Sequence, residues 1–151
     1  MELLMTILLM NLAVALFTVF DIVGFYHVLT KKTGVLDSIA KLDILVYRGV
    51  QTLFQVGLIY VLYAFVNIEA AIGFTLLWWF GLCDLLYYVF SKQEYTKFKT
   101  MPWLWWTPLG IINKLRGHGE IDSTKFVNQA VAPWIIINAI LIVLAFINLF
   151  N

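Results

Sequence analysis

Hydrophobic positions along the chain form four long runs separated by polar segments. A helix of about 20 residues crosses the ~30 Å hydrocarbon layer of a bilayer, and each run is of about that length. The runs cover approximately residues 3–28, 42–66, 71–90 and 131–150. We therefore predict an all-α integral membrane protein with four transmembrane helices, forming a single polytopic domain over residues 1–151.

The third run organises the rest of the chain because it places a charge deep in an apolar segment. Within residues 73–90, the only Asp, Glu, Lys, Arg or His residue is Asp84. A carboxylate near the bilayer centre costs about 2.5–3.5 kcal/mol on insertion scales, so it faces a partner or a water-filled cavity. Tyr87 and Tyr88 follow at three and four residues, on the same helix face as Asp84. This run predicts where the polar interior of the protein lies.

Turn, capping and proline residues indicate where several of the predicted spans begin and end. The short turn around Asn67 makes the second and third spans antiparallel neighbours. The first run has only Glu2 as a charged residue near its start and is too long for a secretory signal, so it is interpreted as a retained span. Ser123 or Thr124 is placed to cap the last helix. We expect Pro133 near the start of the fourth span, where its missing N–H is harmless.

A tryptophan-rich segment precedes that last helix. Residues 101–112 are apolar but too short to cross a bilayer, and Pro102 and Pro108 interrupt any single helix through them. Tryptophan prefers the headgroup level, so Trp103 and its neighbours predict an interfacial segment. The alternative is a re-entrant loop, which would need shelter from lipid by surrounding protein.

Polar side chains in all four spans fall at a similar expected depth. At ~1.5 Å per residue they lie about 10 Å inside one membrane boundary. They are Asp21, Arg48, Gln51, Gln55, Asp84, Tyr87 and Asn138. We predict that these residues form a buried polar layer or a ligand-binding site. Within it we expect Arg48 to pair with Asp84, with Asp21 as a third partner or as the free acid, because an unpaired buried charge is costly.

Composition and charge agree with a membrane location and predict an orientation. Hydrophobic residues make up 62% of the chain and charged residues 13%, against about 45–50% and 25% in soluble domains. All 10 lysines and arginines lie within residues 31–48 and 92–125. The positive-inside rule then places these loops in the cytoplasm and both termini outside, most simply in a prokaryotic plasma membrane. A net charge of +1 without a basic patch excludes a general nucleic-acid binder.

Three functions fit such a polar layer. The favoured prediction is a non-catalytic accessory subunit that forms an oligomer or binds partner membrane subunits. The first alternative is an enzyme or binding protein for a lipid or isoprenoid headgroup, in which Arg48 holds a phosphate or carboxylate and an aspartate acts as acid or base. The second is a small proton-coupled transporter. In span number and in Asp21 the chain resembles small multidrug exporters, although their acidic residue is glutamate and the long third loop differs.

Other chemistries have weaker support in the sequence. Asp21 and His27 are six residues apart and fall on different helix faces, while His118 and Glu120 lie in a polar loop without further ligands. Cys83 sits in an apolar helix and is expected to be buried and inert. We therefore expect neither a metal nor a cofactor, and the sequence leaves open whether the chain is an enzyme.

Overall fold

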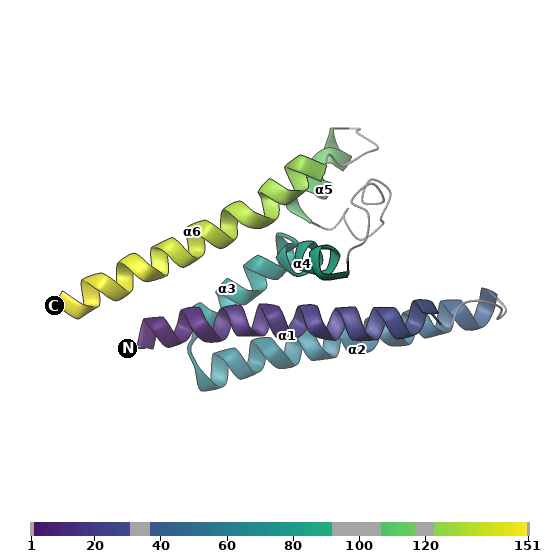
Figure 1. Ribbon diagram of the computed structural model, residues 1–151, viewed down its shortest axis with the longest axis horizontal. Coiled ribbons are helices and arrows are strands. Elements are labelled where there is room, and N and C mark those ends of the chain that lie inside the picture. The colour runs from purple at the N-terminus through teal and green to yellow at the C-terminus, as the bar shows by residue number, and fades with distance from the viewer. Residues whose placement is uncertain (1, 31–36, 92–106, 117–122, 151) are drawn as a thin grey trace.

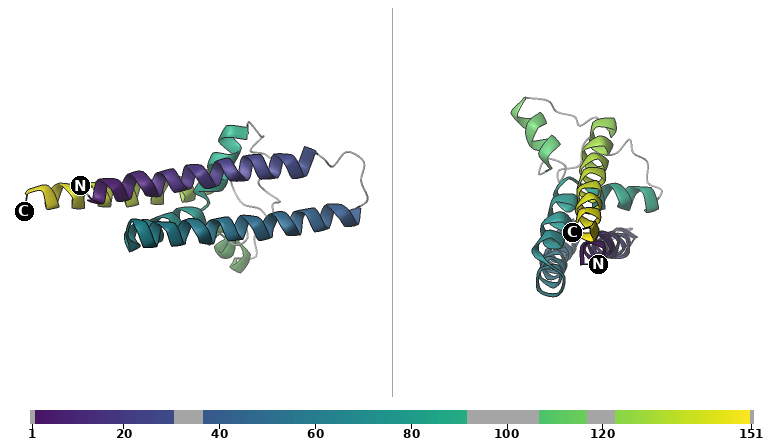
Figure 2. Two further views of the ribbon diagram at one scale, coloured as in Figure 1. Left: turned by 90° about the horizontal axis from the view of Figure 1, so that it is seen from below. Right: turned by 90° about the vertical axis from the view of Figure 1, so that its left-hand side faces the viewer.

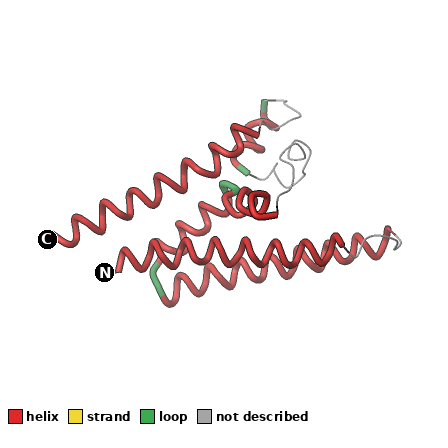
Figure 3. The backbone as a smooth tube through the Cα atoms, viewed as in Figure 1, coloured by secondary structure: helices red, strands yellow, loops and turns green. Residues whose placement is uncertain are grey.

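The computed structural model describes residues 2–30, 37–91, 107–116 and 123–150. This part of the chain is helical, in agreement with the predicted all-α class (Figures 1 and 3). Its helices are α1 (Glu2–Thr30), α2 (Asp37–Phe65), α3 (Ile68–Trp79), α4 (Leu82–Ser91), α5 (Pro108–Leu115) and α6 (Ser123–Phe150). Trp103, Trp105 and Trp106 lie outside the described residues, as do His118 and Glu120.

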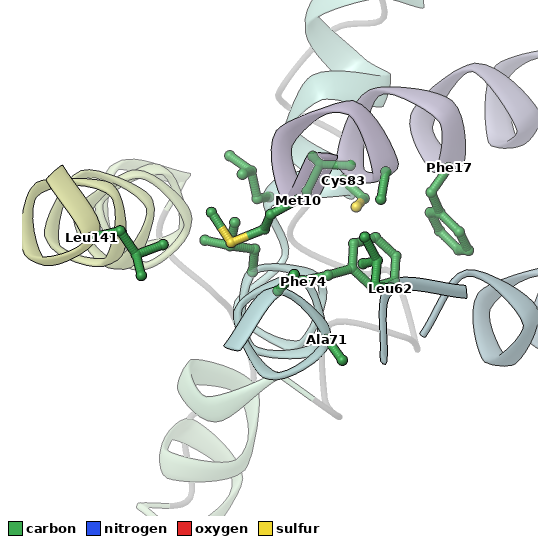
Figure 4. Close-up of a cluster of buried hydrophobic side chains, with 12 residues drawn as sticks. Met10, Phe17, Leu62, Ala71, Phe74, Cys83 and Leu141 are labelled. Atoms are coloured by element: carbon green, nitrogen blue, oxygen red, sulfur yellow. The ribbon is translucent and has the colours of Figure 1, made fainter. Parts of the chain in front are cut away.

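Helix α1 supplies a large part of the hydrophobic core. It packs against α2, α3, α4 and α6, and the buried hydrophobic side chains of all five helices meet around it (Figure 4). The labelled members of this core are Met10, Phe17, Leu62, Ala71, Phe74, Cys83 and Leu141. Gly73 lets α3 approach α1 closely, because a Cβ at this position would collide with the sulfur of Met10. The predicted burial of Cys83 is confirmed.

Within the described residues, two helices are long and apolar enough to cross a membrane. They are the segments Glu2–Gly24 of α1 and Thr124–Asn148 of α6, while α3 is a shorter apolar helix. The polar residues along one face of α2 lower its hydropathy, and the third hydrophobic run is divided between two short helices. The start of α1 and the end of α6 lie at the same end of the molecule (Figures 1 and 2).

The expected continuous third span, residues 71–90, is wrong as a single helix. Helix α3 ends at Trp79, and Gly81 adopts a φ of 86°, a conformation that only glycine accepts readily. Helix α4 then turns sharply away from the line of α3 (Figures 1 and 2). A Cβ on Gly81 would also lie 2.8 Å from the ring of Phe126, so the break is closely covered by α6.

Two prolines behave differently from the sequence expectation. Helix α6 begins at Ser123, so Pro133 lies inside the helix rather than near its start. Pro108 does not only interrupt a helix; it begins α5, where its missing N–H costs nothing. Thr107 caps this helix by accepting a hydrogen bond from the Gly110 N–H at 3.3 Å. The short turn between α2 and α3 is present as predicted, with Asn67 capping α3.

Candidate functional site

The buried carboxylate of α1, Asp21, is held by two donors from α2. Tyr47 donates its hydroxyl to Asp21 Oδ1, and Gln51 Nε2 donates to the same oxygen at 2.6 Å. Tyr47 and Gln51 are one helical turn apart, so both reach across to α1 from one face of α2. Gly24 makes room for the aromatic ring, because a Cβ there would lie 2.5 Å from Tyr47 Cε2. Asp21 is only 6% exposed, and its role in the structure is to join α1 to α2.

Arg48 reaches this network through an amide rather than through a carboxylate. Its Nη1 donates to Gln51 Oε1 at 2.6 Å, and its guanidinium carbon lies 5.9 Å from the centre of the Tyr47 ring. In the part of the chain that the structure describes, Arg48 forms no ion pair with Asp84 or Asp21. The expected Arg48–Asp84 pair is therefore wrong: the guanidinium donates to Gln51, which in turn donates to Asp21.

A cavity of about 210 Å³ lies beside Arg48. Its lining residues come from α2, α3, α4 and the cap of α5: Arg48, Gln51, Thr52, Gln55, Trp78, Trp79, Asp84 and Thr107. The structure thus brings four of the predicted site residues, Arg48, Gln51, Gln55 and Asp84, to one hollow. Because a water molecule occupies roughly 30 Å³ in the liquid, the cavity can hold several waters or a small polar group.

Asp84 enters the cavity because of the helix break. It lies in the first turn of α4, where the partial positive charge of a helix N-terminus favours a carboxylate. Among the described residues, no side chain or backbone group forms a hydrogen bond or an ion pair with its carboxylate. Asp84 therefore contrasts with Asp21, whose acceptor oxygen is already occupied.

Gln129 of α6 supports the wall of the cavity and was missed from the sequence. Its Nε2 donates to the carbonyl oxygen of Phe80 at 3.2 Å, and its Oε1 accepts from the backbone N–H of Leu109. One side chain thus satisfies the backbone at the α3–α4 break and at the first turn of α5. The available signal was an amide within a largely apolar helix, but the sequence did not indicate its two partners.

The remaining predicted residues lie elsewhere. Tyr87 is buried on α4 in a cluster with Phe126 and Ala130, and does not line the cavity. Asn138 does not join the polar layer, because its Oδ1 accepts from Asn11 Nδ2 at 2.8 Å. Trp134 Nε1 completes this group by donating to Asn11 Oδ1 at 2.8 Å. Asn11 and Asn138 therefore join α1 to α6 at a separate place.

Comparison with known proteins supplies no relative for this site. No protein-family model matches the chain, and no curated protein or solved structure is significantly similar to it. Within the described residues, no group of three or more histidine, cysteine or acidic side chains is arranged to hold a metal ion. The chemistry of the cavity is therefore argued from its own residues.

Proposed function

We propose that this chain is an integral membrane protein that binds the polar headgroup of a lipid or isoprenoid in the cavity beside Arg48. The observation that carries the proposal is the composition of the cavity: a guanidinium, two glutamines and a carboxylate beside two tryptophans, at the junction of four helical segments. A small hollow with a few convergent polar groups is the usual form of a ligand site.

The exposed surface of the bundle supports a membrane location. Large apolar side chains face outward along α1, α2 and α6, including Leu8 (61% exposed), Leu53 (73%) and Phe65 (80%). So many exposed large apolar side chains are not typical of a soluble monomer, and lipid would cover them. We propose four membrane segments, formed by α1, α2, the α3–α4 pair and α6, with the basic loops in the cytoplasm and the termini outside.

An amphiphile fits the change of polarity along α2. Arg48, Thr52 and Gln55 line the cavity, and the next turn on the same side of the helix carries Ile59. A ligand with a polar head and an apolar chain would match this order of side chains.

Arg48 is suited to the anionic part of such a head. Its guanidinium is not neutralised by an ion pair from any described carboxylate, and its five donors match the geometry of phosphate or carboxylate. Gln51 already takes one of these donors and thereby orients the group. We therefore assign the anion-binding role to Arg48.

Lipid retention tests the proposal. The protein would be purified in a mild detergent, and bound lipids would be measured by native mass spectrometry for the wild type, for Arg48→Gln and for the control Arg116→Gln. Arg116 is an exposed arginine at the end of α5, outside the cavity. We expect a stoichiometric lipid in the wild type and in the control, and its loss in Arg48→Gln.

Two results would contradict the headgroup site. One is a wild-type protein without any bound lipid, and the other is equal lipid in both arginine variants. A wild type that carries no lipid and is stable only in a defined complex with another membrane subunit would instead favour the accessory-subunit hypothesis.

The proposed orientation has its own test. Because Cys83 is the chain's single cysteine, Cys83→Ala gives a background in which Asn151→Cys is the only thiol. We expect a membrane-impermeant maleimide to label that thiol in intact cells. Labelling only after lysis would reverse the orientation.

A further inference from the structure

We infer that the headgroup is zwitterionic, with its phosphate against Arg48 and an ammonium group against Asp84 and Trp78. This inference rests on the proposed function and specifies its ligand. The structure provides two opposite charges that line one cavity without forming an ion pair with each other.

The separation of the two charges is the first argument. Arg48 is held by Gln51, while the carboxylate of Asp84 has no hydrogen-bond or ion-pair partner in the part of the chain that is described. A purely anionic ligand would satisfy Arg48 but would be repelled by Asp84, and a purely cationic ligand would do the reverse. A head with adjacent phosphate and ammonium groups gives each side chain an opposite charge.

The tryptophans are the second argument. Trp78 and Trp79 line the same cavity, and the indole ring is the best aromatic partner for an ammonium group within about 6 Å of its face. Trp78 is partly exposed and Trp79 is 42% exposed, so a ligand in the cavity can reach both rings. A carboxylate beside indole rings is a combination suited to an ammonium group rather than to a neutral hydroxyl.

The helix break is the third argument, because it brings these groups together. Trp78 and Asp84 are six residues apart, and at 3.6 residues per turn they would point to different faces of one continuous helix. The positive φ of Gly81 redirects α4, so that Trp78 from α3 and Asp84 from α4 line one hollow. The break therefore has a binding consequence beyond shortening the span.

The test compares lipids that differ only in the head. Dihexanoyl phosphatidylethanolamine and phosphatidylcholine would be titrated into detergent-solubilised protein against dihexanoyl phosphatidylglycerol and phosphatidic acid, with native mass spectrometry as the readout. We expect the wild type to prefer at least one zwitterionic lipid about tenfold, equivalent to about 1.4 kcal/mol. Asp84→Asn should reduce this preference to near parity while anionic lipids still bind.

Matched variants separate this inference from the proposed function. Glu69→Gln removes an exposed carboxylate outside the cavity and should keep the wild-type preference. Arg48→Gln should weaken all four lipids by similar factors. Equal binding of zwitterionic and anionic lipids by the wild type would overturn the zwitterion inference alone, as would an unchanged preference in a folded Asp84→Asn. A wild type that binds none of the four lipids would overturn the headgroup site itself.

If Asp84→Asn does not fold, Trp78→Phe provides the second variant. Phenylalanine retains most of the packing but is a weaker cation partner than indole. We expect a reduced preference for the zwitterionic lipids with little change for phosphatidic acid. An unchanged preference in this variant would overturn the role given to Trp78.

Discussion

The surroundings of Asp21 and of Asp84 differ sharply, although both are aspartates within long hydrophobic runs. Asp21 lies between α1 and α2, is 6% exposed and accepts hydrogen bonds from Tyr47 and Gln51. Asp84 lines a cavity and has no hydrogen-bond partner within the described residues. The first carboxylate is part of the packing between helices, and the second faces space that a ligand can occupy.

This difference shows that residue type and depth do not decide the role of a buried acid. The deciding factor is whether neighbouring helices supply donors. Tyr47 and Gln51 come from one face of an unbroken helix, whereas the turn at Gly81 carries Asp84 away from α3 toward an open space. Satisfied groups stabilise the fold, and unsatisfied ones are candidates for binding.

The largest expected effect comes from removing the acceptor at Asp21. Asp21→Ala leaves the buried Tyr47 hydroxyl and the half-buried Gln51 amide without their shared acceptor oxygen. Hydrogen bonds to charged groups contribute about 1.5–3 kcal/mol each, so we expect a loss of about 3 kcal/mol in the free energy of unfolding. Unfolding in detergent, followed by circular dichroism, measures it against Asp84→Ala. Equal losses in the two variants would contradict the distinction between the two acids.

Gly24→Ala tests the same network without touching a polar group. The added methyl would lie 2.5 Å from Tyr47 Cε2 and should push the ring away from Asp21. Overpacking of this kind costs about 1–3 kcal/mol, and we expect about 2 kcal/mol. Gly57→Ala is the control, since its Cβ meets nothing within 4 Å. If both alanines stabilise the protein equally, Tyr47 is not confined as described.

The sequence was sufficient for the all-α class and for the ends of several helices. The predicted runs 3–28 and 42–66 correspond closely to α1 and α2, because long apolar stretches bounded by charge are direct indicators of helices. The layer was also partly predictable. Arg48, Gln51 and Gln55 share a helix face by spacing alone, and they do line one cavity.

The features that the sequence analysis predicted wrongly or missed have one physical origin: each depends on residues that are distant in the sequence. Glycine is common within membrane helices, so Gly81 gave no sign that its φ would be positive or that Phe126 would cover it. Asn138 was expected in the polar layer, but the packing of α6 on α1 places it against Asn11. The role of Gln129 requires two backbone groups from distant segments, which no local pattern encodes.

Gln129→Leu tests how the helix break beside Asp84 is stabilised. It removes the partner of the Phe80 carbonyl and of the Leu109 N–H, next to the cavity wall. We expect a loss of about 1–2 kcal/mol, in the range for buried backbone groups left unsatisfied. Asn128→Leu, at an exposed neighbouring position, is the control. A loss confined to Gln129→Leu, measured by thermal unfolding in detergent, supports the bridging role, and equal losses would argue against it.

The smallest expected effect is the coupling energy between Arg48 and Asp84, and it decides whether Asp84, unlike Asp21, is free to bind a ligand. A double-mutant cycle of Arg48→Gln and Asp84→Asn measures whether these residues stabilise one another. A direct buried pair would couple strongly, because removing one partner leaves the other charge uncompensated at a cost of about 3–5 kcal/mol.

In the structure Arg48 donates to Gln51 instead, and the two charges act on each other only across the cavity. We therefore expect the two losses to add within about 0.5 kcal/mol, and Asp84→Asn alone to change stability by less than about 1 kcal/mol. Asp84→Asn also removes the desolvation cost of a carboxylate in an apolar segment, which further reduces the expected loss of stability. A coupling energy above about 2 kcal/mol in lipid-free protein would show that Arg48 and Asp84 form a direct ion pair. The charge of Asp84 would then already be neutralised and could not bind the ammonium group of a ligand.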